Sequence, residues 1–334
     1  MSDIKLSFCI PTYNRSNYIR QTLTSISDQI IEAGWTDCIE ICVSDNASTD
    51  NTDEEIHNFQ ADYPSVKLVY SKNDENLGAD RNYLRVVELA SGEYCWLFGS
   101  DDALVPGAVK SLLSEIKHKF DIYLCNRVDC NNALTPVRKY CWLDIPGDRV
   151  YDFALQSELE DYFRSARSIG AVFSYLSSII VRKSQWNAVT YDTSMTGTAY
   201  SHVYILVSLM VNGATLKYLQ DTMVYCRFGN DSFALDGAYK RFMIDLVGYS
   251  KIATKLLENN EAKSEFLKIM TREQPLNRLA KIRFFYKDKW SEVKGYLNYF
   301  EYSKFTIISA EVIGSVPYLV GLMLRVKRTF TRLR

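Results

Sequence analysis

The sequence has few histidines, and it lacks the cysteine spacing of a zinc site. The 3 histidines are His57, His118 and His202. None of the 8 cysteines belongs to a CxxC pair, and the nearest spacings, Cys38/Cys42 and Cys125/Cys130, are looser than those of zinc fingers or ribbons. A structural zinc site is therefore not expected. The chain is also too long for a disulfide scaffold, so we expect reduced thiols.

Glycine-rich phosphate-binding motifs are also missing. Neither GxGxxG nor GxxxxGK[ST] occurs, which argues against a dinucleotide-dependent dehydrogenase and against a P-loop kinase or ATPase. Sugar nucleotidyltransferases need a glycine-rich loop after the first strand, whereas residues 11–15 read PTYNR. The amino terminus, MSDIKLSF, has charged residues where a signal peptide would be apolar. We therefore expect a cytoplasmic protein.

Charge is balanced over the whole chain but not along it. Lys and Arg total 39 and Asp and Glu total 40, and no nucleic-acid partner is expected. Residues 324–334 contain basic side chains without an acidic one, which suits an anionic lipid surface. These residues are Arg325, Lys327, Arg328, Arg332 and Arg334.

The segment before this basic end, residues 305–324, is nearly apolar. It is long enough to span a bilayer, but Glu311 and Pro317 weaken that interpretation. Two interpretations stay open: an amphipathic helix on the inner face of the cell membrane, and a helix packed on the catalytic domain.

The first 125 residues alternate β-rich runs with helical patterns, which predicts an α/β fold with a mostly parallel, Rossmann-like sheet flanked by helices. The expected strands are 5–10, 38–43, 66–70, 94–98 and 121–125, and the expected helices are 18–31, 53–62, 79–89 and 108–117. Residues 126–236 form a mixed region, with strands at 175–182 and 222–227 and a helix at 200–210. Residues 237–334 are expected to form a helical extension. We thus predict segments 1–125, 126–236 and 237–334.

Polar segments follow the expected strands: 11–15, 45–50, 73–78 and 99–102. Ligands of such sheets bind beyond the carboxyl ends of the strands, so these loops should meet at one edge. Asp101 and Asp102 are adjacent carboxylates, which repel each other unless a cation compensates. A divalent ion that bridges a diphosphate would do so, and oxygen ligands select Mg²⁺ or Mn²⁺. The alternative is that an aspartate caps the helix near Val105.

The first two loops carry groups that suit a nucleoside. Asp45 can accept a hydrogen bond from the amino group of cytosine or the ring NH of uracil, so it leaves the nucleotide open. Tyr13 can stack on the base and Thr12 can bond to base or ribose. Arg81, one turn into a helix, can face a phosphate. The alternatives are an Asx-rich turn for Asp45 and a surface ion pair for Arg81.

Together the four loops resemble, in order and spacing, the nucleotide-binding half of family-2 GT-A glycosyltransferases. The motifs are PTYNR (11–15), SDNASTD (44–50), NLG (76–78) and SDD (100–102). The resemblance covers about residues 4–125 and implies a GT-A fold in which 1–125 binds the nucleotide-sugar and 126–236 the acceptor. It implies Asp102 as ligand of Mn²⁺ or Mg²⁺ and Asp101 as a contact to ribose or metal. The implied donor-binding residues are Pro11, Thr12, Tyr13, Arg15, Asp45, Asn76, Arg81 and Asp101.

Two later segments, 170–178 and 227–233, are similar to the abequosyltransferases of O-antigen assembly. This resemblance implies transfer of a 3,6-dideoxyhexose from CDP-abequose to a lipid-linked oligosaccharide at the membrane surface. Two alternatives stay open: another transferase of surface polysaccharide synthesis that uses a UDP- or dTDP-linked sugar, and a scaffold that binds nucleotide-sugars without turnover.

The expected catalytic base is missing. Inverting members usually carry an acidic pair at a helix start in the acceptor half, where this chain reads YSHV (200–203). His202 is therefore a candidate base or metal ligand, with packing as the alternative. Asp231 is the other candidate carboxylate, with a turn as the alternative. The missing pair is consistent with retention, in which the leaving phosphate takes the proton, and both stereochemical outcomes stay open.

Overall fold

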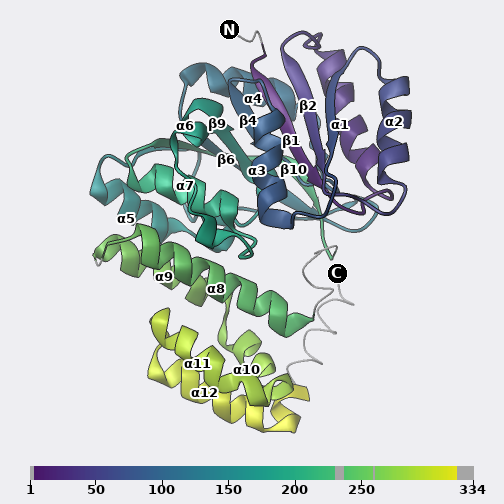
Figure 1. Ribbon diagram of the computed structural model, residues 1–334. Coiled ribbons are helices and arrows are strands. Elements are labelled where there is room, and N and C mark those ends of the chain that lie inside the picture. The colour runs from purple at the N-terminus through teal and green to yellow at the C-terminus, as the bar shows by residue number, and fades with distance from the viewer. Residues whose placement is uncertain (1–3, 230–236, 259, 322–334) are drawn as a thin grey trace. The chain divides into compact units, whose positions relative to one another are not determined.

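The computed structural model describes residues 4–229, 237–258 and 260–321. The chain divides into two compact units. The first comprises Met1–Ala166 and Gly170–Asn230, and the second comprises Arg167–Ile169 and Asp231–Arg334 (Figure 1). The predicted division of the first unit at residue 125 into donor and acceptor halves stays a prediction.

One sheet of mixed direction forms the centre of the first unit. Its strands are β1 Leu6–Thr12, β2 Ile39–Asp45, β3 Lys67–Lys72, β4 Tyr94–Leu97, β5 Ala103–Leu104, β6 Ile122–Cys130, β7 Pro136–Tyr140, β8 Arg149–Asp152, β9 Ile179–Arg182 and β10 Thr215–Arg227. The order is β3-β2-β1-β4-β9-β6-β10-β5, with β7 beside β6 and β8 beside β10. The pairs β3/β2, β2/β1, β1/β4 and β6/β10 are parallel, while β9 runs antiparallel to both its neighbours.

Helices cover both faces of this sheet (Figure 1). They are α1 Ile19–Glu32, α2 Thr52–Asp62, α3 Ala79–Leu89, α4 Ala108–Glu115, α5 Gln156–Ser165, α6 Lys183–Ala188 and α7 Ser201–Val211. Helix α1 contacts α2 and α4, whereas α7 contacts α3 and α6. The predicted α/β class with a mostly parallel sheet is confirmed.

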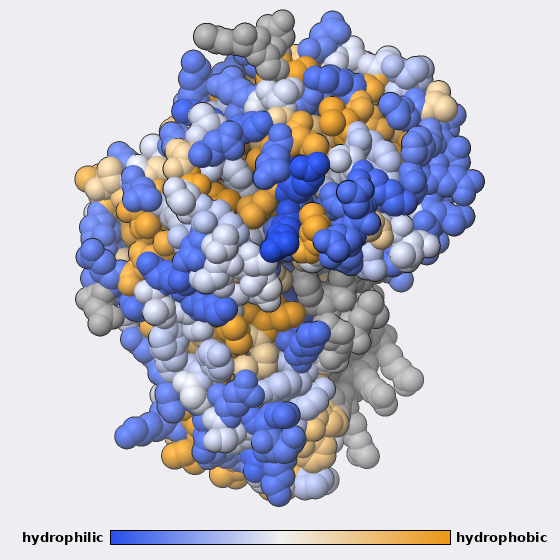
Figure 2. Space-filling model, in the orientation of Figure 1, coloured by the Kyte–Doolittle hydropathy of each residue, from blue (hydrophilic) through white to orange (hydrophobic). Residues whose placement is uncertain are grey.

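The central strands are mostly apolar, with a few buried polar residues such as Glu40 and Asp45. Every residue of β1, β2 and β4 is buried, as expected for a parallel sheet covered on both faces. Phe8 stacks on Trp96 with ring centroids 5.1 Å apart, and Phe98 meets both rings edge-on. On the face that Figure 2 shows, hydrophobic residues occur in small patches among polar ones. Burial in this core is therefore the main force that fixes the sheet.

Two expected strands differ from the structure in a way that matters for the site. The strand expected at 175–182 begins only at Ile179, because Leu176–Ser178 form a 3-10 turn. The strand expected at 222–227 is the last part of the long β10. All 8 cysteines are free, as expected.

The second unit is helical, with α8 Ala238–Leu256, α9 Glu261–Glu273, α10 Leu276–Phe285, α11 Trp290–Tyr299 and α12 Lys304–Ser315. Asn260 caps α9 by accepting a hydrogen bond from the Lys263 backbone, and Ser303 caps α12 in the same way. Gly314 lets α12 approach α10, since a Cβ there would lie 2.7 Å from the Ala280 carbonyl oxygen. Among the described residues, no helix has the length and hydropathy needed to cross a bilayer.

Candidate active site

The carboxyl ends of the first strands bring the predicted donor residues to one edge. The register pairs Thr12 with Asp45 across β1 and β2, and Asp45 with Lys72 across β2 and β3. Thr12 and Asp45 are buried, whereas Tyr13 is 42% exposed. The loop therefore presents the Tyr13 ring at the surface, where a planar base can stack on it.

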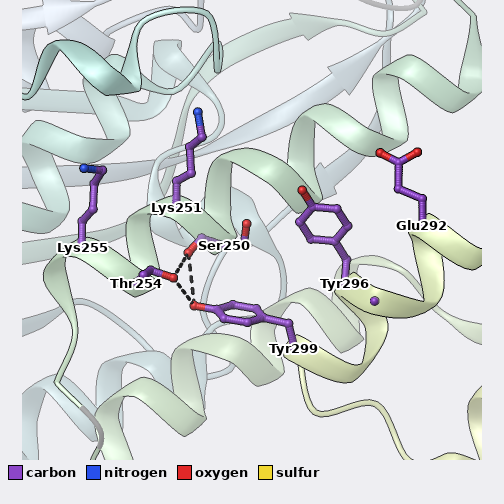
Figure 3. Close-up of a pocket in the computed structure, with 8 residues that line it drawn as sticks. Ser250, Lys251, Thr254, Lys255, Glu292, Tyr296 and Tyr299 are labelled. Carbon is purple, nitrogen blue, oxygen red and sulfur yellow. Dashed lines mark hydrogen bonds between the residues drawn. The ribbon is translucent and has the colours of Figure 1, made fainter.

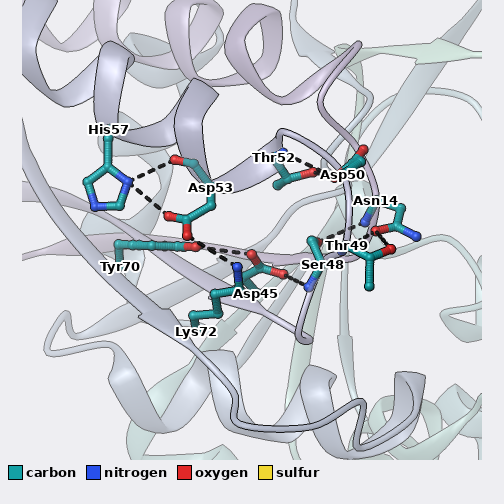
Figure 4. Close-up of polar contacts among 10 residues, drawn as sticks. All are labelled: Asn14, Asp45, Ser48, Thr49, Asp50, Thr52, Asp53, His57, Tyr70 and Lys72. Atoms are coloured by element: carbon teal, nitrogen blue, oxygen red, sulfur yellow. Dashed lines mark hydrogen bonds and ion pairs between the residues drawn. The ribbon is translucent and has the colours of Figure 1, made fainter.

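Asp45 is already hydrogen-bonded within this edge. One carboxylate oxygen accepts the Ser48 backbone N–H at 2.8 Å, and the other accepts the Tyr70 hydroxyl at 3.0 Å (Figure 4). Burial, and then the charge of Asp45, raise the pKa of Tyr70, so its hydroxyl stays a donor. The Asx-type turn expected as the alternative for Asp45 is thus present. The contact of Asp45 with a nucleobase stays a prediction. It would use the lone pairs of the carboxylate that Ser48 and Tyr70 leave free.

The loop after β2 also holds the loop after β1. Asp50 accepts hydrogen bonds from the backbone and hydroxyl of Ser16, and from Thr52 at the start of α2. Burial raises the pKa of Asp50, but these hydrogen bonds outweigh it and lower the pKa below its usual value. Asn14, in a left-handed conformation with φ of 52°, accepts the Thr49 N–H through its side chain (Figure 4). These residues fix the shape of the edge that the loops after β1 and β2 form.

Asparagines connect the next loop to this edge. The Asn46 side chain donates to Asn76 Oδ1 at 2.7 Å and accepts the Leu77 N–H at 2.8 Å. Asn82, buried inside α3, accepts the Ser44 hydroxyl at 2.7 Å and donates to the Ser44 carbonyl at 2.9 Å. The predicted residue Asn76 thus has a positioning role. Asn82 was missed, although a polar amide on the inner face of α3 marks such a network.

The two aspartates after β4 have unlike surroundings. The Asp101 side chain is 20% exposed, and one of its oxygens lies 3.9 Å from Nη2 of Arg15. Asp102 is buried and accepts the Tyr175 hydroxyl at 2.7 Å, the Ser177 hydroxyl at 2.5 Å and the Arg227 backbone N–H at 3.2 Å. Burial, followed by the charge of Asp101, raises the pKa of Asp102 to about 7, and these hydrogen bonds oppose the shift. Asp101 is therefore the more accessible carboxylate.

The segment 170–178 forms the wall behind Asp102. Its 3-10 turn directs Ser177 toward Asp102, and the Ser177 hydroxyl also accepts the Gly99 N–H at 2.8 Å. A Cβ on Gly99 would lie 2.9 Å from the Asp102 carboxylate. A Cβ on Gly170 would overlap Trp142, whose indole N–H donates to Ser178 at 3.0 Å. Gly99 thus allows close packing at the aspartate pair, and Gly170 allows close packing against Trp142.

Two arginines that sequence reasoning left without a role support this region. Arg227 donates from Nε to the Asp101 carbonyl at 3.0 Å and lies over the Tyr18 ring at 4.8 Å. Arg127 is enclosed by aromatic rings, with its guanidinium carbon 4.4 Å from the Tyr175 centroid and 4.9 Å from that of Trp142. Sequence spacing carries no signal for these contacts because they join segments far apart in the chain.

The Asp80 carboxylate fixes the loop that precedes α7 in the chain. Its buried carboxylate accepts backbone N–H groups from Gly197 at 2.7 Å, Ala199 at 2.8 Å and Ser201 at 2.8 Å. The loop contains two residues with positive φ, Gly197 and Ala199, so the hydrogen bonds stabilise a backbone that is strained at alanine. Arg81 is exposed. Of the two acidic residues considered for its surface ion pair, Asp80 accepts these three backbone N–H groups, and Glu88 lies 3.6 Å from Nη1 of Arg85.

His202 is buried at the first turn of α7. Its Nε2 lies 3.0 Å from the Phe173 carbonyl, which makes Nε2 the protonated nitrogen, and its ring meets Tyr83 edge-on. Within the described part of the chain, Nδ1 has no hydrogen-bond partner. Burial lowers the pKa of His202 to about 4 against the charge of Asp80. These contacts give His202 a packing role, and its predicted roles as base or metal ligand stay predictions. Asp231, the other candidate, lies outside the described residues.

Metal binding by side chains alone is not supported by the described residues, which contain no group of three His, Cys, Asp or Glu positioned to hold an ion. One or two carboxylates suffice when a substrate diphosphate and water supply the other ligands of Mg²⁺. Asp101 fits that description by its exposure. Asp102 is buried and accepts three hydrogen bonds from the chain, and its implied role as metal ligand stays a prediction.

Comparisons with known proteins agree with this arrangement. Residues 7–168 match the family described as Glycosyl transferase family 2. Over 274 residues the chain is 42% identical to abequosyltransferase RfbV of Salmonella typhimurium, which covers 81% of this chain and 81% of the relative.

Solved structures share the fold at low sequence identity. The S. aureus TarS fragment 1–349 in complex with UDP-GlcNAc aligns with a TM-score of 0.62 at 16% identity, over 89% of this chain and 80% of that one. Mannosyltransferase PcManGT from Pyrobaculum calidifontis, in complex with GDP-Man and Mn²⁺, aligns with a TM-score of 0.51 at 14% identity, over 93% of this chain and 86% of that one. These likenesses extend the fold beyond the donor half.

Proposed function

The chain belongs to glycosyl transferase family 2, and we propose that it transfers a 3,6-dideoxyhexose such as abequose from a CDP-linked donor to a lipid-linked oligosaccharide of O-antigen assembly. It is a glycosyltransferase. The observation that carries the finer proposal is the 42% identity to an abequosyltransferase over 81% of both chains. That similarity includes the wall segment 170–178, which lies outside the part of the chain that matches the family as a whole.

In this proposal the first unit binds the donor at the carboxyl edge of its sheet. Tyr13 stacks on the base, Thr12 and Asp45 contact the nucleoside, and Arg81 approaches a phosphate from the first turn of α3. Asp101 contributes a carboxylate to a Mn²⁺ or Mg²⁺ ion, which, when bound, neutralises the leaving diphosphate. Asp102 and its hydrogen-bonded wall fix the position of Asp101.

The acceptor hydroxyl needs a proton acceptor, and the described residues near α7 supply no carboxylate that is free of structural hydrogen bonds. Asp80 is bonded to three backbone N–H groups, and His202 has a pKa of about 4 with one nitrogen bonded to a carbonyl. We therefore propose transfer with retention, in which an oxygen of the leaving phosphate accepts the proton.

Membrane association is the remaining part of the proposal. Helix α12 exposes Phe305, Ile308 and Val312 at 79%, 57% and 57%. Their spacing of three and four residues places them on one face of the helix. This face supports an in-plane contact with the lipid that carries the acceptor.

The test compares the rate of transfer from CDP-abequose with the rate from UDP-GlcNAc. Each donor is assayed with and without Mn²⁺, with a lipid-linked oligosaccharide extract as acceptor. We expect transfer from the CDP-linked sugar only, and a product whose NMR coupling shows the anomeric configuration of the donor. Transfer from UDP-GlcNAc alone would replace the proposed donor. An inverted product would contradict retention and return a base role to His202 or Asp231.

A further inference from the structure

We propose that Arg127 is a positioning residue for the two aspartates after β4, and that it acts through the ring of Tyr175. The Tyr175 hydroxyl donates to Oδ2 of Asp102 at 2.7 Å. The guanidinium carbon of Arg127 lies 4.4 Å from the centroid of the same ring. This inference rests on the donor site proposed above, since it concerns the pair of carboxylates to which that proposal assigns the ion.

The hairpin of β6 and β7 holds Arg127 at this ring. Arg127 and Asp129 are two residues apart on β6, so their side chains share one face of the sheet. The register places Arg138 of β7 opposite Asp129. One Asp129 oxygen lies 2.9 Å from Nε of Arg127, and the other accepts Nη2 of Arg138 at 2.7 Å. The aspartate thus fixes Arg127 from the side of the hairpin.

Three aromatic rings surround the guanidinium. Its carbon lies 4.4 Å from the centroid of Tyr175, 4.9 Å from that of Trp142 and 5.3 Å from that of Tyr140, all within the ~6 Å over which a cation attracts a ring face. Trp142 is itself fixed, because its indole N–H donates to the Cys125 carbonyl at 2.9 Å. The Arg127 side chain is only 17% exposed, so the rings, more than solvent, set its orientation.

Packing alone does not account for an arginine at this position. A buried charge costs desolvation free energy, and an apolar side chain of similar size often stabilises a fold as well as a buried ion pair does. A cation over the Tyr175 ring adds what an apolar side chain lacks, an electrostatic attraction to the ring face that limits the movement of the ring. The hydroxyl at the end of that ring is then held in one place.

The two hydroxyls that bond to Oδ2 of Asp102 are fixed in different ways. The Ser177 hydroxyl donates at 2.5 Å and also accepts the Gly99 N–H at 2.8 Å. For Tyr175, the contact with Arg127 fixes the ring and therefore the direction of the hydroxyl. Groups that orient a metal ligand through hydrogen bonds change metal affinity or activity by about 10- to 100-fold when they are removed. Arg127 should therefore affect the ion through Tyr175.

The experiment is isothermal titration of the full chain with CDP, with and without Mn²⁺. The wild type should bind CDP more tightly when Mn²⁺ is present. In Arg127→Met and in Tyr175→Phe this gain in affinity should fall about tenfold. Affinity for CDP without metal should not change, because the residues proposed for the nucleoside are intact. A purely structural role would weaken binding with and without Mn²⁺ alike.

A double variant tests the route through Tyr175. If Arg127 acts by fixing this ring, adding Arg127→Met to Tyr175→Phe should cause no further loss, because the hydroxyl is already gone. Additive losses would overturn the proposed route. Arg127→Lys, which keeps the charge but not the planar group, repeats the test should Arg127→Met fail to fold.

Two variants serve as matched controls. Arg182 also lies near a tyrosine ring, 5.7 Å from the centroid of Tyr94, and pairs with Asp121, but it lies opposite the first residue of β4, away from the carboxyl ends of the strands. The Tyr299 hydroxyl lies 2.7 Å from the Thr254 hydroxyl in a pocket of the second unit (Figure 3). Arg182→Met and Tyr299→Phe should keep the wild-type gain from Mn²⁺, even if their melting temperatures fall.

The outcomes separate this inference from the proposed function. The inference is overturned if Arg127→Met or Tyr175→Phe keeps the wild-type gain from Mn²⁺, or if either control loses as much of it. A wild type that binds CDP equally well with and without Mn²⁺ would contradict the metal-dependent donor site itself, and this inference with it.

Discussion

At the scale of single residues, the two aspartates after β4 differ in how far their carboxylates are exposed to solvent. Asp101 is partly open to solvent and lies near Arg15, whereas Asp102 accepts hydrogen bonds from three chain donors. A carboxylate that already satisfies buried donors contributes mainly to structure, because its removal would leave those donors unpaired. The metal role that the resemblance implies for Asp102 stays a prediction, and the exposure of Asp101 makes that carboxylate the second candidate ligand.

We expect Asp101→Asn to lower kcat at least ~100-fold, because a neutral amide no longer neutralises the diphosphate with the ion. Its melting temperature should stay close to that of the wild type. Asp102→Ala should lower the free energy of unfolding by about 1 to 3 kcal/mol, since buried donors lose their acceptor. Turnover assays over a Mn²⁺ titration, together with calorimetry, measure both effects. Near-normal turnover of Asp101→Asn would transfer the metal role back to Asp102.

Burial changes the pKa of His202 and so decides whether it can act as a base. Its ordinary pKa near 6.5 would suit a base, but burial lowers it to about 4. The unfolded chain therefore takes up a proton at a higher pH than the folded protein does. The free energy of unfolding is therefore highest above about pH 6.5, where His202 is neutral in both states, and it falls as the pH drops toward 4.

We expect His202→Gln to remove this pH dependence of the free energy of unfolding. The whole pKa shift of His202 corresponds to at most about 3 kcal/mol. Urea unfolding between pH 4.5 and 7.5 measures it, with His118→Gln as control because that histidine is exposed. The same variant should retain kcat within a few-fold. A loss of ~100-fold or more with an altered acidic limb of the pH profile would instead identify His202 as the base.

At the scale of elements, α12 forms the first part of the apolar segment 305–324 and has two unlike faces. One face packs on α10 through Ile307, Ala310 and Gly314, while the opposite face is exposed. The helix stops at Ser315, before Pro317. This packing is on another helix of the second unit, so packing on the catalytic domain stays a prediction, as does contact with the membrane. Deleting α12 would disrupt its packing on α10 as well as remove the exposed face.

A triple substitution tests the exposed face alone. Phe305→Ser, Ile308→Ser and Val312→Ser together should reduce binding to vesicles of phosphatidylglycerol and phosphatidylcholine at least ~10-fold, since three apolar side chains no longer enter the interface. Co-sedimentation measures the bound fraction.

The matched control replaces exposed apolar residues elsewhere by serine, at Val137, Val150 and Leu155. It should bind vesicles like the wild type. Equal binding of both triple variants would show that α12 does not contact the membrane, and the basic end at 324–334 would then be tested by replacing its arginines.

At the scale of the whole molecule, the two units have different buried charges, so they respond differently to pH. In the second unit, burial and then the charge of Asp245 raise the pKa of Glu273 to about 7, against the opposing effect of Arg278. Between about pH 4.5 and 7 the folded chain holds a proton that the unfolded chain has released. The free energy of unfolding of this unit therefore falls as the pH rises through that window.

We expect Glu273→Gln to remove this loss, which is up to about 3 kcal/mol, and so to raise the melting temperature of the second unit above pH 7. Calorimetry from pH 5 to 8 measures it, with exposed Glu258→Gln as control. The sign is opposite to that for His202, so single variants separate the two effects. A Glu273→Gln variant with unchanged pH dependence would contradict the assignment.

The sequence alone determined the parallel strands β1 to β4, the helices α1 to α4 and the loops that follow those strands, whereas β5, β7 and β8 were not predicted. Strand periodicity and buried apolar runs identified β1 to β4 within two residues, and helix 79–89 coincides with α3. These features depend on local periodicity and on polar residues placed at strand ends, both of which are visible in one sequence. The motif resemblance then gave the family, which the comparisons confirm.

The tertiary structure alone decided which polar side chains are open and which are already bonded. Asp45, Asp80 and Asp102 look alike in the sequence, yet all three are buried acceptors, while Asp101 keeps a partly exposed side chain. Their partners come from segments up to 125 residues away, as in the bond from Arg227 to Asp102. Sequence spacing contains no information on such pairs, because it is chain folding that brings distant donors and acceptors within hydrogen-bond distance.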